Sequence, residues 1–142
     1  YMAMYFEKYP DVKKYMELTK EFASQNGYVE TLFGRRLYLR DINATNAMRR
    51  QASERAAINA PVQGTAADIM KIAMINMHKA IKKEKSEAKL ILQVHDELIL
   101  DTPKDEIDKI VSLITDSMMG AANLDVPLEI DIGIGDNWDQ AH

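Results

Sequence analysis

The chain has 142 residues, 46% of them apolar, and a formal net charge of −4, which fits one folded domain or one large part of a domain. It contains no cysteine, which excludes disulfides and thiolate metal sites and favours a reducing compartment. No apolar run approaches the roughly 18 residues of a membrane span, so we expect no membrane partner.

The chain begins with a predicted helix over residues 1–25, because apolar side chains recur there at helical spacing. Pro10 predicts a break in this helix, and Gly27 predicts its C-terminal end. Since the amphipathic pattern is already under way at residue 1, we expect the gene product to start upstream. Two β-prone runs then surround Phe33 and Gly34, which predicts a short hairpin over residues 28–39.

The middle of the chain is predicted to form two helices. The turn-like residues 41–46 offer Asn43, Thr45 and Asn46 as N-caps for a helix through residues 48–59. Pro61 interrupts that helix, and a longer one follows with Thr65 and Asp68 as a pair resembling a capping box. The expected buried stripe of this second helix is Ile69, Ile72, Ala73, Asn76, Met77 and Ala80. Its methionines are expected to fill the core.

The last third is predicted to hold a second hairpin, a helix and a strand. Residues 90–94 and 97–101 form the hairpin, residues 101–119 form a helix capped by Thr102 with Pro103 at its first position, and residues 126–135 alternate as a strand. Residues 136–142 are a polar tail. The element order indicates an α+β fold, an antiparallel sheet with helices packed on one face.

Three ionisable residues, His95, Asp96 and Glu97, occupy the tip of this second hairpin. Tight hairpin turns favour Asn-Gly or paired glycines, so this tip gives up turn propensity. One interpretation is a polar, solvated turn. The other is a metal site, and carboxylates without cysteine suit a hard cation such as Mg²⁺.

A metal site at this tip would be incomplete. Asp96 and Glu97 are successive residues near a strand and point to opposite faces, so they do not easily chelate one ion together. A two-metal site therefore needs a further carboxylate from elsewhere. The candidates in this chain are Glu129, Asp131 and Asp136.

A second constellation lies around Pro61. Arg55 and Asn59 are four residues apart and share a helix face, and Gln63 continues that line if the break is slight. Such a row suits contacts with the polar edges of bases in the DNA minor groove. The alternative is a network that satisfies the interrupted helix backbone.

Charge is distributed unevenly along the chain. Every arginine falls within residues 35–55, where only Asp41 and Glu54 oppose them: Arg35, Arg36, Arg40, Arg49, Arg50 and Arg55. Residues 101–139 hold ten acidic side chains against Lys104 and Lys109. This polarity predicts a basic face and an acidic region. A plain solvated surface is the alternative for the basic segment.

Four stretches together carry a family resemblance: YVETLFGRRLYL, ERAAINAPVQGTAADIMK, QVHDEL and VPLEIDIGIGDNWDQAH. In this order and spacing, the chain resembles the C-terminal part of the bacterial DNA polymerases of the A family over essentially all 142 residues. The resemblance implies a fragment of the polymerase fingers and palm. Residues 1 to about 45 would end the fingers, with Arg35 and Arg36 in their last hairpin, and about 46–142 would belong to the palm.

The resemblance also implies roles for the two constellations. Asp96 would be a catalytic aspartate that binds Mg²⁺, Glu97 its acidic partner, and His95 a residue near the primer terminus. Arg55, Asn59 and Gln63 match family positions that contact primer-template DNA. The reaction would be template-directed nucleotidyl transfer from deoxynucleoside triphosphates with two metal ions, in DNA replication and repair.

Two family features are missing from this sequence: the first palm motif, with the other metal-binding aspartate, and the helix that binds the triphosphate. The resemblance therefore implies that the remainder of the polymerase chain is a partner and that the isolated chain is inactive. It also implies a cytoplasmic, nucleoid-associated protein. The alternatives are a non-catalytic DNA-binding module, which would use the arginines without a metal, and a purely structural α+β domain.

Overall fold

The computed structural model describes residues 2–142, so Tyr1 of the predicted first helix lies outside the described residues. The chain forms two compact units, Tyr1–Ala66 and Ala67–His142, whose boundary falls inside one long helix. Within residues 2–142, no helix is both long enough and apolar enough to cross a membrane.

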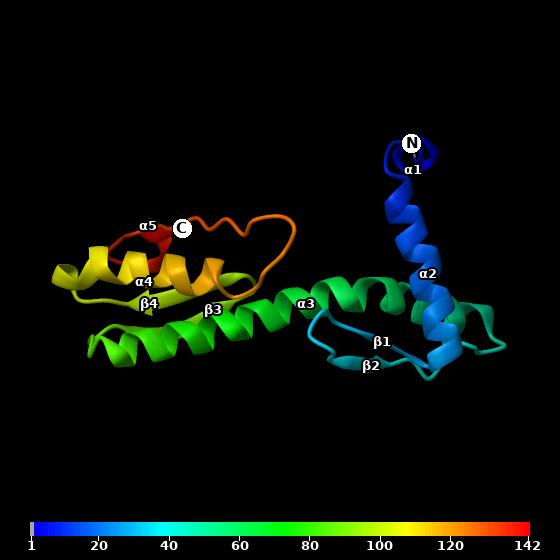
Figure 1. Ribbon diagram of the computed structural model, residues 1–142, viewed down its shortest axis with the longest axis horizontal. Helices are drawn as coiled ribbons and strands as arrows, with labels where there is room; N and C mark the ends of the chain where they lie inside the picture. The colour runs from blue at the N-terminus through cyan, green and yellow to red at the C-terminus, as the bar shows by residue number, and fades with distance from the viewer. Residues whose placement is uncertain (1) are drawn as a thin grey trace. The chain divides into compact units, whose positions relative to one another are not determined.

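The first unit begins with two helices, α1 (Met2–Lys8) and α2 (Pro10–Asn26), followed by an antiparallel hairpin of β1 (Tyr28–Glu30) and β2 (Arg36–Tyr38) (Figure 1). The predicted break is confirmed, because Pro10 occupies the first turn of α2. Gly27 ends α2 with a φ of 78°, and its N–H donates to the Ala23 carbonyl. The hairpin is confirmed as well, with Gly34 at positive φ in its loop.

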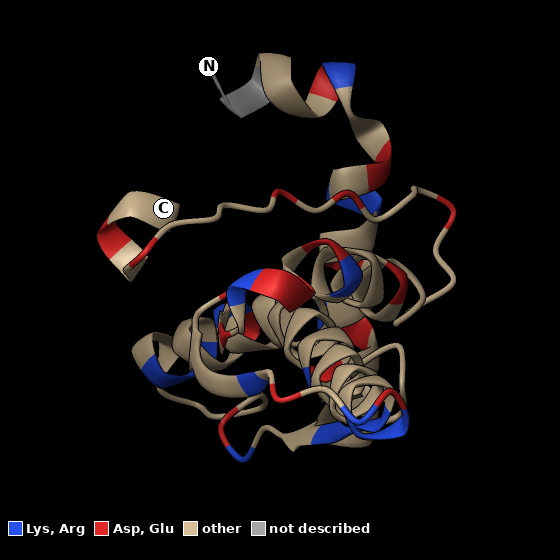
Figure 2. Cartoon of the chain, turned by 90° about the vertical axis from the view of Figure 1, so that its left-hand side faces the viewer, with Lys and Arg blue, Asp and Glu red and all other residues tan. Residues whose placement is uncertain are grey.

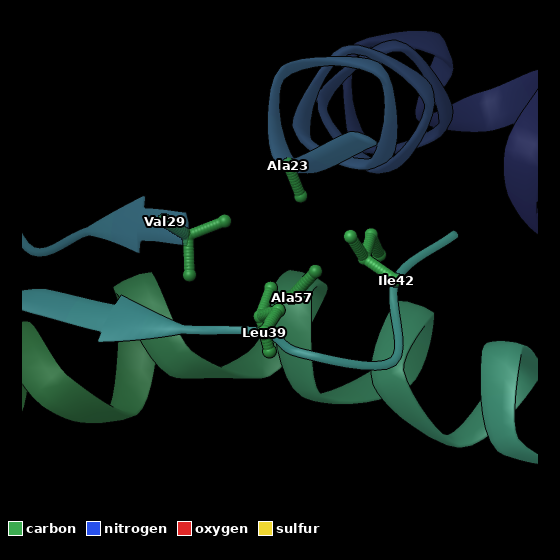
Figure 3. Packing of buried hydrophobic residues seen from close by; sticks show 5 residues of the cluster. All are labelled: Ala23, Val29, Leu39, Ile42 and Ala57. Carbon is green, nitrogen blue, oxygen red and sulfur yellow. The ribbon is translucent and has the colours of Figure 1, made fainter. Parts of the chain in front are cut away.

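The core of this unit gathers small and branched side chains from α2, from β1, from the segment after β2 and from the next helix, α3 (Ala47–Lys83). Figure 3 shows the cluster: Ala23, Val29, Leu39, Ile42 and Ala57. Ala23 and Ala57 are fully buried, and their small side chains let α2 and α3 approach the hairpin closely. The core therefore fixes the part of α3 that carries Arg55, Asn59 and Gln63.

The prediction of two helices around Pro61 is wrong, because α3 is continuous from Ala47 to Lys83. Proline removes a single backbone N–H, and contacts from other elements hold α3 on both sides of it. Thr65 is consequently no N-cap, and its hydroxyl instead accepts a hydrogen bond from the Leu32 N–H at 2.9 Å. The true start of α3 is capped by Asn46, one of the three predicted residues, whose side-chain oxygen accepts from Met48 and Arg49 N–H.

The second unit contains the rest of α3, a hairpin of β3 (Lys89–Val94) and β4 (Glu97–Asp101), a 3₁₀ turn η1 (Lys104–Glu106), and helices α4 (Ile107–Met119) and α5 (Trp138–Ala141). The second hairpin is confirmed, with antiparallel pairing. Its apolar face packs on both helices: Met77 and Ile81 of α3 and Ile110 of α4 cluster with Leu90, Leu98 and Leu100. Helices therefore pack on one face of an antiparallel sheet, as predicted.

Two local predictions in this unit are corrected by the structure, and one segment gains a helix that was not predicted. Thr102 does not cap a helix, because Pro103 precedes a 3₁₀ turn and α4 begins only at Ile107. Residues 126–135 form no strand, since no other described segment pairs with their backbone groups. The polar tail contains α5, a short helix whose first turn is capped by the Asn137 side chain.

Candidate active site

His95 and Asp96 form a two-residue turn between β3 and β4, closed by the facing pair Val94 and Glu97. Both turn residues are exposed to solvent. His95 has a φ of 51°, a left-handed conformation, and its carbonyl accepts a hydrogen bond from the Gln93 side chain at 3.2 Å. The hairpin thus presents the Asp96 carboxylate at a turn held between two paired strands.

The neighbouring carboxylate, Glu97, has a different environment. It is partly buried, and its Oε1 lies 3.1 Å from the Nδ1 of His142. The His142 ring in turn meets the Trp138 ring edge-on, with centroids 6.4 Å apart. Glu97 therefore contacts the C-terminal segment, whereas Asp96 stands at the exposed turn.

The oxygen donors at this tip suit a hard cation, but they are few. Among residues 2–142, no group of three or more His, Cys, Asp or Glu side chains is arranged to hold a metal ion. Asp136, one of the candidate partners, pairs instead with Lys104 at 2.9 Å. Asp96 fits the role of one carboxylate ligand, and the structure does not bring Glu129, Asp131 and Asp136 together with it into a cluster.

Arg55, Asn59 and Gln63 are all exposed side chains of α3. Because α3 continues through Pro61, their spacing of four residues places them along one helix face. The side-chain hydrogen bonds around Pro61 are made by Tyr15 and Arg35 as donors and by Thr65 as an acceptor, rather than by this row. The row is thus available on the first unit's surface for contacts with a ligand.

Several arginines of the basic segment pair with other groups of the first unit. Arg36 binds Glu30 at 2.6 Å and lies over the Tyr28 ring, and its hydrogen bond to Glu30 raises the pKa of the guanidinium. Arg49 pairs with Asp41 at 3.0 Å. Figure 2 shows the contrasting segment that leads to the C-terminus, with acidic residues and no basic ones.

The model of DNA polymerase family A matches residues 1–140 of the chain. The chain belongs to DNA polymerase family A. It is 51% identical to the DNA polymerase I of Pseudomonas aeruginosa over 142 residues, all of this chain and 16% of that relative. It is 46% identical to the thermostable DNA polymerase I of Thermus thermophilus over 138 residues, which are 97% of this chain and 16% of that protein.

A solved structure shows the same fold. The POL domain of Pol1 from M. smegmatis, in complex with DNA primer-template and dNTP, superposes with a TM-score of 0.97 at 43% identity. The match covers 99% of this chain and 25% of that one. The resemblance expected from the four motifs is therefore confirmed, and the chain spans about one-sixth of the length of the relatives named here.

Sequence reasoning missed two sets of contacts near the candidate residues. Nothing local predicts the pairing of Glu97 with His142, which is 45 positions further along the chain. The contacts that Tyr15 and Thr65 make around Pro61 were also missed. The sequence signal that could have predicted these contacts is Gly64, directly after Gln63. A glycine inside a helical pattern indicates a packing reason, such as close approach of another element.

Proposed function

We propose that this chain is the C-terminal part of a DNA-directed DNA polymerase and that it contributes the end of the fingers and the C-terminal portion of the palm. The observation that carries the proposal is the exposed carboxylate of Asp96 at the turn of a paired hairpin, in a chain that belongs to DNA polymerase family A. The boundary between fingers and palm near residue 45 is part of the proposal. It lies just before α3, which begins at Ala47.

The reaction is template-directed nucleotidyl transfer, in which a primer 3′-hydroxyl attacks the α-phosphate of a deoxynucleoside triphosphate. The new P–O bond forms as the bond between the α- and β-phosphates breaks, and pyrophosphate leaves. Asp96 supplies a carboxylate ligand for Mg²⁺, and Glu97 is the neighbouring acidic group. The chemistry supplied by a pair of such ions is stabilisation of the attacking and leaving oxygens. The second aspartate ligand belongs to another part of the polymerase chain. A turn between paired strands holds Asp96 more rigidly than a long loop would.

Primer-template DNA is the proposed partner of the exposed row on α3. Arg55, Asn59 and Gln63 offer donors and acceptors but no nucleophile, which suits recognition rather than chemistry. His95 is placed next to Asp96 and would lie near the primer terminus. Support comes from the M. smegmatis structure, which was solved with primer-template and dNTP. We include roles in DNA replication and repair and a cytoplasmic location at the nucleoid in the proposal.

The test uses a chimera in which these 142 residues replace the matching segment of the Pseudomonas aeruginosa DNA polymerase I, which aligns over the whole chain. We expect the folded chimera to extend a primer with Mg²⁺. Replacing the carboxylate by an isosteric amide, Asp96→Asn, should lower the extension rate by at least about 100-fold, the size of effect typical of a lost transition-state contact. Primer-template binding should persist.

The matched control is Asp101→Asn, which removes an exposed aspartate from the far end of the same hairpin. This variant should extend primers like the parent chimera. Extension by Asp96→Asn at the parental rate would contradict the role of Asp96 and leave DNA binding without metal as the better reading of the site. A folded chimera that fails to extend any primer would contradict the proposal as a whole.

A further inference from the structure

The turn of α3 that contains Pro61 is held from both sides by other elements of the first unit. On the N-terminal side, the Tyr15 hydroxyl of α2 donates to the Ile58 carbonyl at 2.9 Å. On the C-terminal side, the loop of the β1–β2 hairpin donates twice: from the Leu32 N–H to Thr65 Oγ1 at 2.9 Å, and from Arg35 Nη2 to the Gly64 carbonyl at 3.0 Å. We call these three hydrogen bonds the bracket.

The hairpin loop is itself closed, so it is a firm anchor for the bracket. The Thr31 N–H donates to the Arg35 carbonyl at 2.9 Å, and the Arg35 N–H donates to Thr31 Oγ1 at 3.1 Å. Gly34 N–H also donates to the Thr31 carbonyl at 2.9 Å. Thr31 is buried, with 9% of its surface exposed. Because the loop is closed by its own hydrogen bonds, its bonds to Gly64 and Thr65 restrain the position of these two residues.

Gly64 lies at a close approach between α3 and the loop. A Cβ atom placed there would lie 2.7 Å from Thr31 Cγ2 and 3.2 Å from Arg35 Nη2. Any larger residue would push the loop away from the helix or turn the helix. Glycine is otherwise a poor choice in a helix interior, so its presence here indicates that close contact matters more than helix propensity.

The bracket encloses two of the three residues of the polar row. Asn59 and Gln63 lie between the two bracketed positions, Ile58 and Gly64, on either side of Pro61. Helices commonly kink at proline, and a kink here would turn Gln63 out of line with Arg55 and Asn59. Holding both sides of the turn keeps the three side chains on one face.

We propose that Thr31, Gly64 and Thr65 are positioning residues, which hold Gln63 in register with Asn59 and Arg55 for contact with primer-template DNA. They act through α3 and do not themselves touch DNA. This inference rests on the proposed function, since it assigns a purpose to the row only if the row binds DNA. The inference assigns the β1–β2 hairpin a role in DNA affinity, because the hairpin restrains the part of α3 that carries Gln63.

The test introduces Gly64→Ala into the chimera and measures the Kd for primer-template DNA on the folded protein. We expect binding to weaken about tenfold, the size of effect of losing a polar contact to DNA. Alanine is a better helix former than glycine, so a purely structural effect on α3 would favour folding and leave the Kd unchanged. Parental affinity in Gly64→Ala would overturn the inference.

A double-mutant cycle with Gln63→Ala shows whether Gly64 acts through Gln63. In the Gln63→Ala background, Gly64→Ala should change the Kd by less than about twofold, since the contact that it misaligns is already absent. Independent effects that multiply would overturn the inference even if each single variant binds weakly.

Two further comparisons, which use three variants, test the clash at Gly64 and the hydrogen bond at Thr65 separately. Thr31→Ser removes the Cγ2 methyl group that the new Cβ would meet and keeps the hydroxyl that accepts from Arg35, so Gly64→Ala with Thr31→Ser should regain most of the affinity. Thr65→Ser should bind DNA more tightly than Thr65→Val, which has no acceptor for the Leu32 N–H. The bracket would be contradicted if Thr31→Ser restored no affinity to Gly64→Ala, or if Thr65→Ser and Thr65→Val bound DNA equally. A parent chimera that is inactive would instead contradict the proposed function, so the two failures are distinguishable.

Discussion

His95 shows how a single backbone conformation links the fold to the proposed site. Its φ of 51° lies in the left-handed region, where glycine and asparagine are the more usual residues of a hairpin turn. The position therefore holds an imidazole next to Asp96 although the turn alone would favour a different residue. Departures of this kind from local preference are expected at functional sites.

The role of His95 is tested by His95→Asn in the chimera. Asparagine adopts the left-handed region readily, so the free energy of unfolding should stay within about 0.5 kcal/mol of the parent. If the imidazole contacts the primer terminus, the rate of primer extension should fall while the urea midpoint is unchanged. Extension at the parental rate would show that His95 serves the turn alone.

The elements that were predicted correctly are those whose signals are local. Both hairpins follow from β-prone runs around a short turn, and the end of α2 follows from Gly27. The identity of the candidate site residues also came from the sequence, through motifs whose family is confirmed.

The elements that were mispredicted depend on partners distant in the sequence. The continuity of α3 through Pro61 involves a Tyr15 hydroxyl that lies 43 positions before Ile58. The alternation of residues 126–135 describes a strand-like chain but supplies no second strand to pair with it, and Val126 is 72% exposed. The periodicity of apolar residues indicates which side of a segment is buried. It does not indicate which other segment packs against it or pairs with it.

The continuity of α3 has a measurable consequence at Pro61. Proline costs about 3 kcal/mol relative to alanine in a helix interior, and its rigidity in the unfolded chain returns at most about 1 kcal/mol. Pro61→Ala should restore an N–H that can donate to the Ala57 carbonyl, and should raise the free energy of unfolding of the 142-residue chain by about 1–2 kcal/mol. Urea unfolding followed by circular dichroism measures this change.

Pro103→Ala is the control for this measurement, because Pro103 precedes the η1 turn in an extended conformation, with a ψ of 141°. No stabilisation is expected there, since no interior helical hydrogen bond is regained. A loss of stability in Pro61→Ala would contradict this account of the cost of Pro61 inside α3.

Taken over its full length, the chain distributes its candidate residues between two compact units. The polar row on α3 lies in Tyr1–Ala66, and His95, Asp96 and Glu97 lie in Ala67–His142. At the hairpin tip of the second unit, the Asp96 side chain is exposed, whereas Glu97 is engaged by His142. We therefore expect substitutions in the α3 row to affect the proposed DNA recognition, and substitutions at the hairpin tip to affect the proposed metal chemistry, independently of each other.

The isolated chain should bind DNA without copying it. Two-metal nucleotidyl transfer needs carboxylates that converge on both ions, and among residues 2–142 no group of three or more acidic, His or Cys side chains does so. We expect the purified 142-residue chain to give no template-dependent primer extension with Mg²⁺ under conditions in which the chimera extends the same primer. The Asp96→Asn form of the isolated chain is measured in parallel, because extension that survives this substitution comes from a contaminating polymerase. Extension by the isolated chain that disappears in Asp96→Asn would place a complete catalytic set within these 142 residues, and would contradict the assignment of the second metal-binding aspartate to another part of the polymerase.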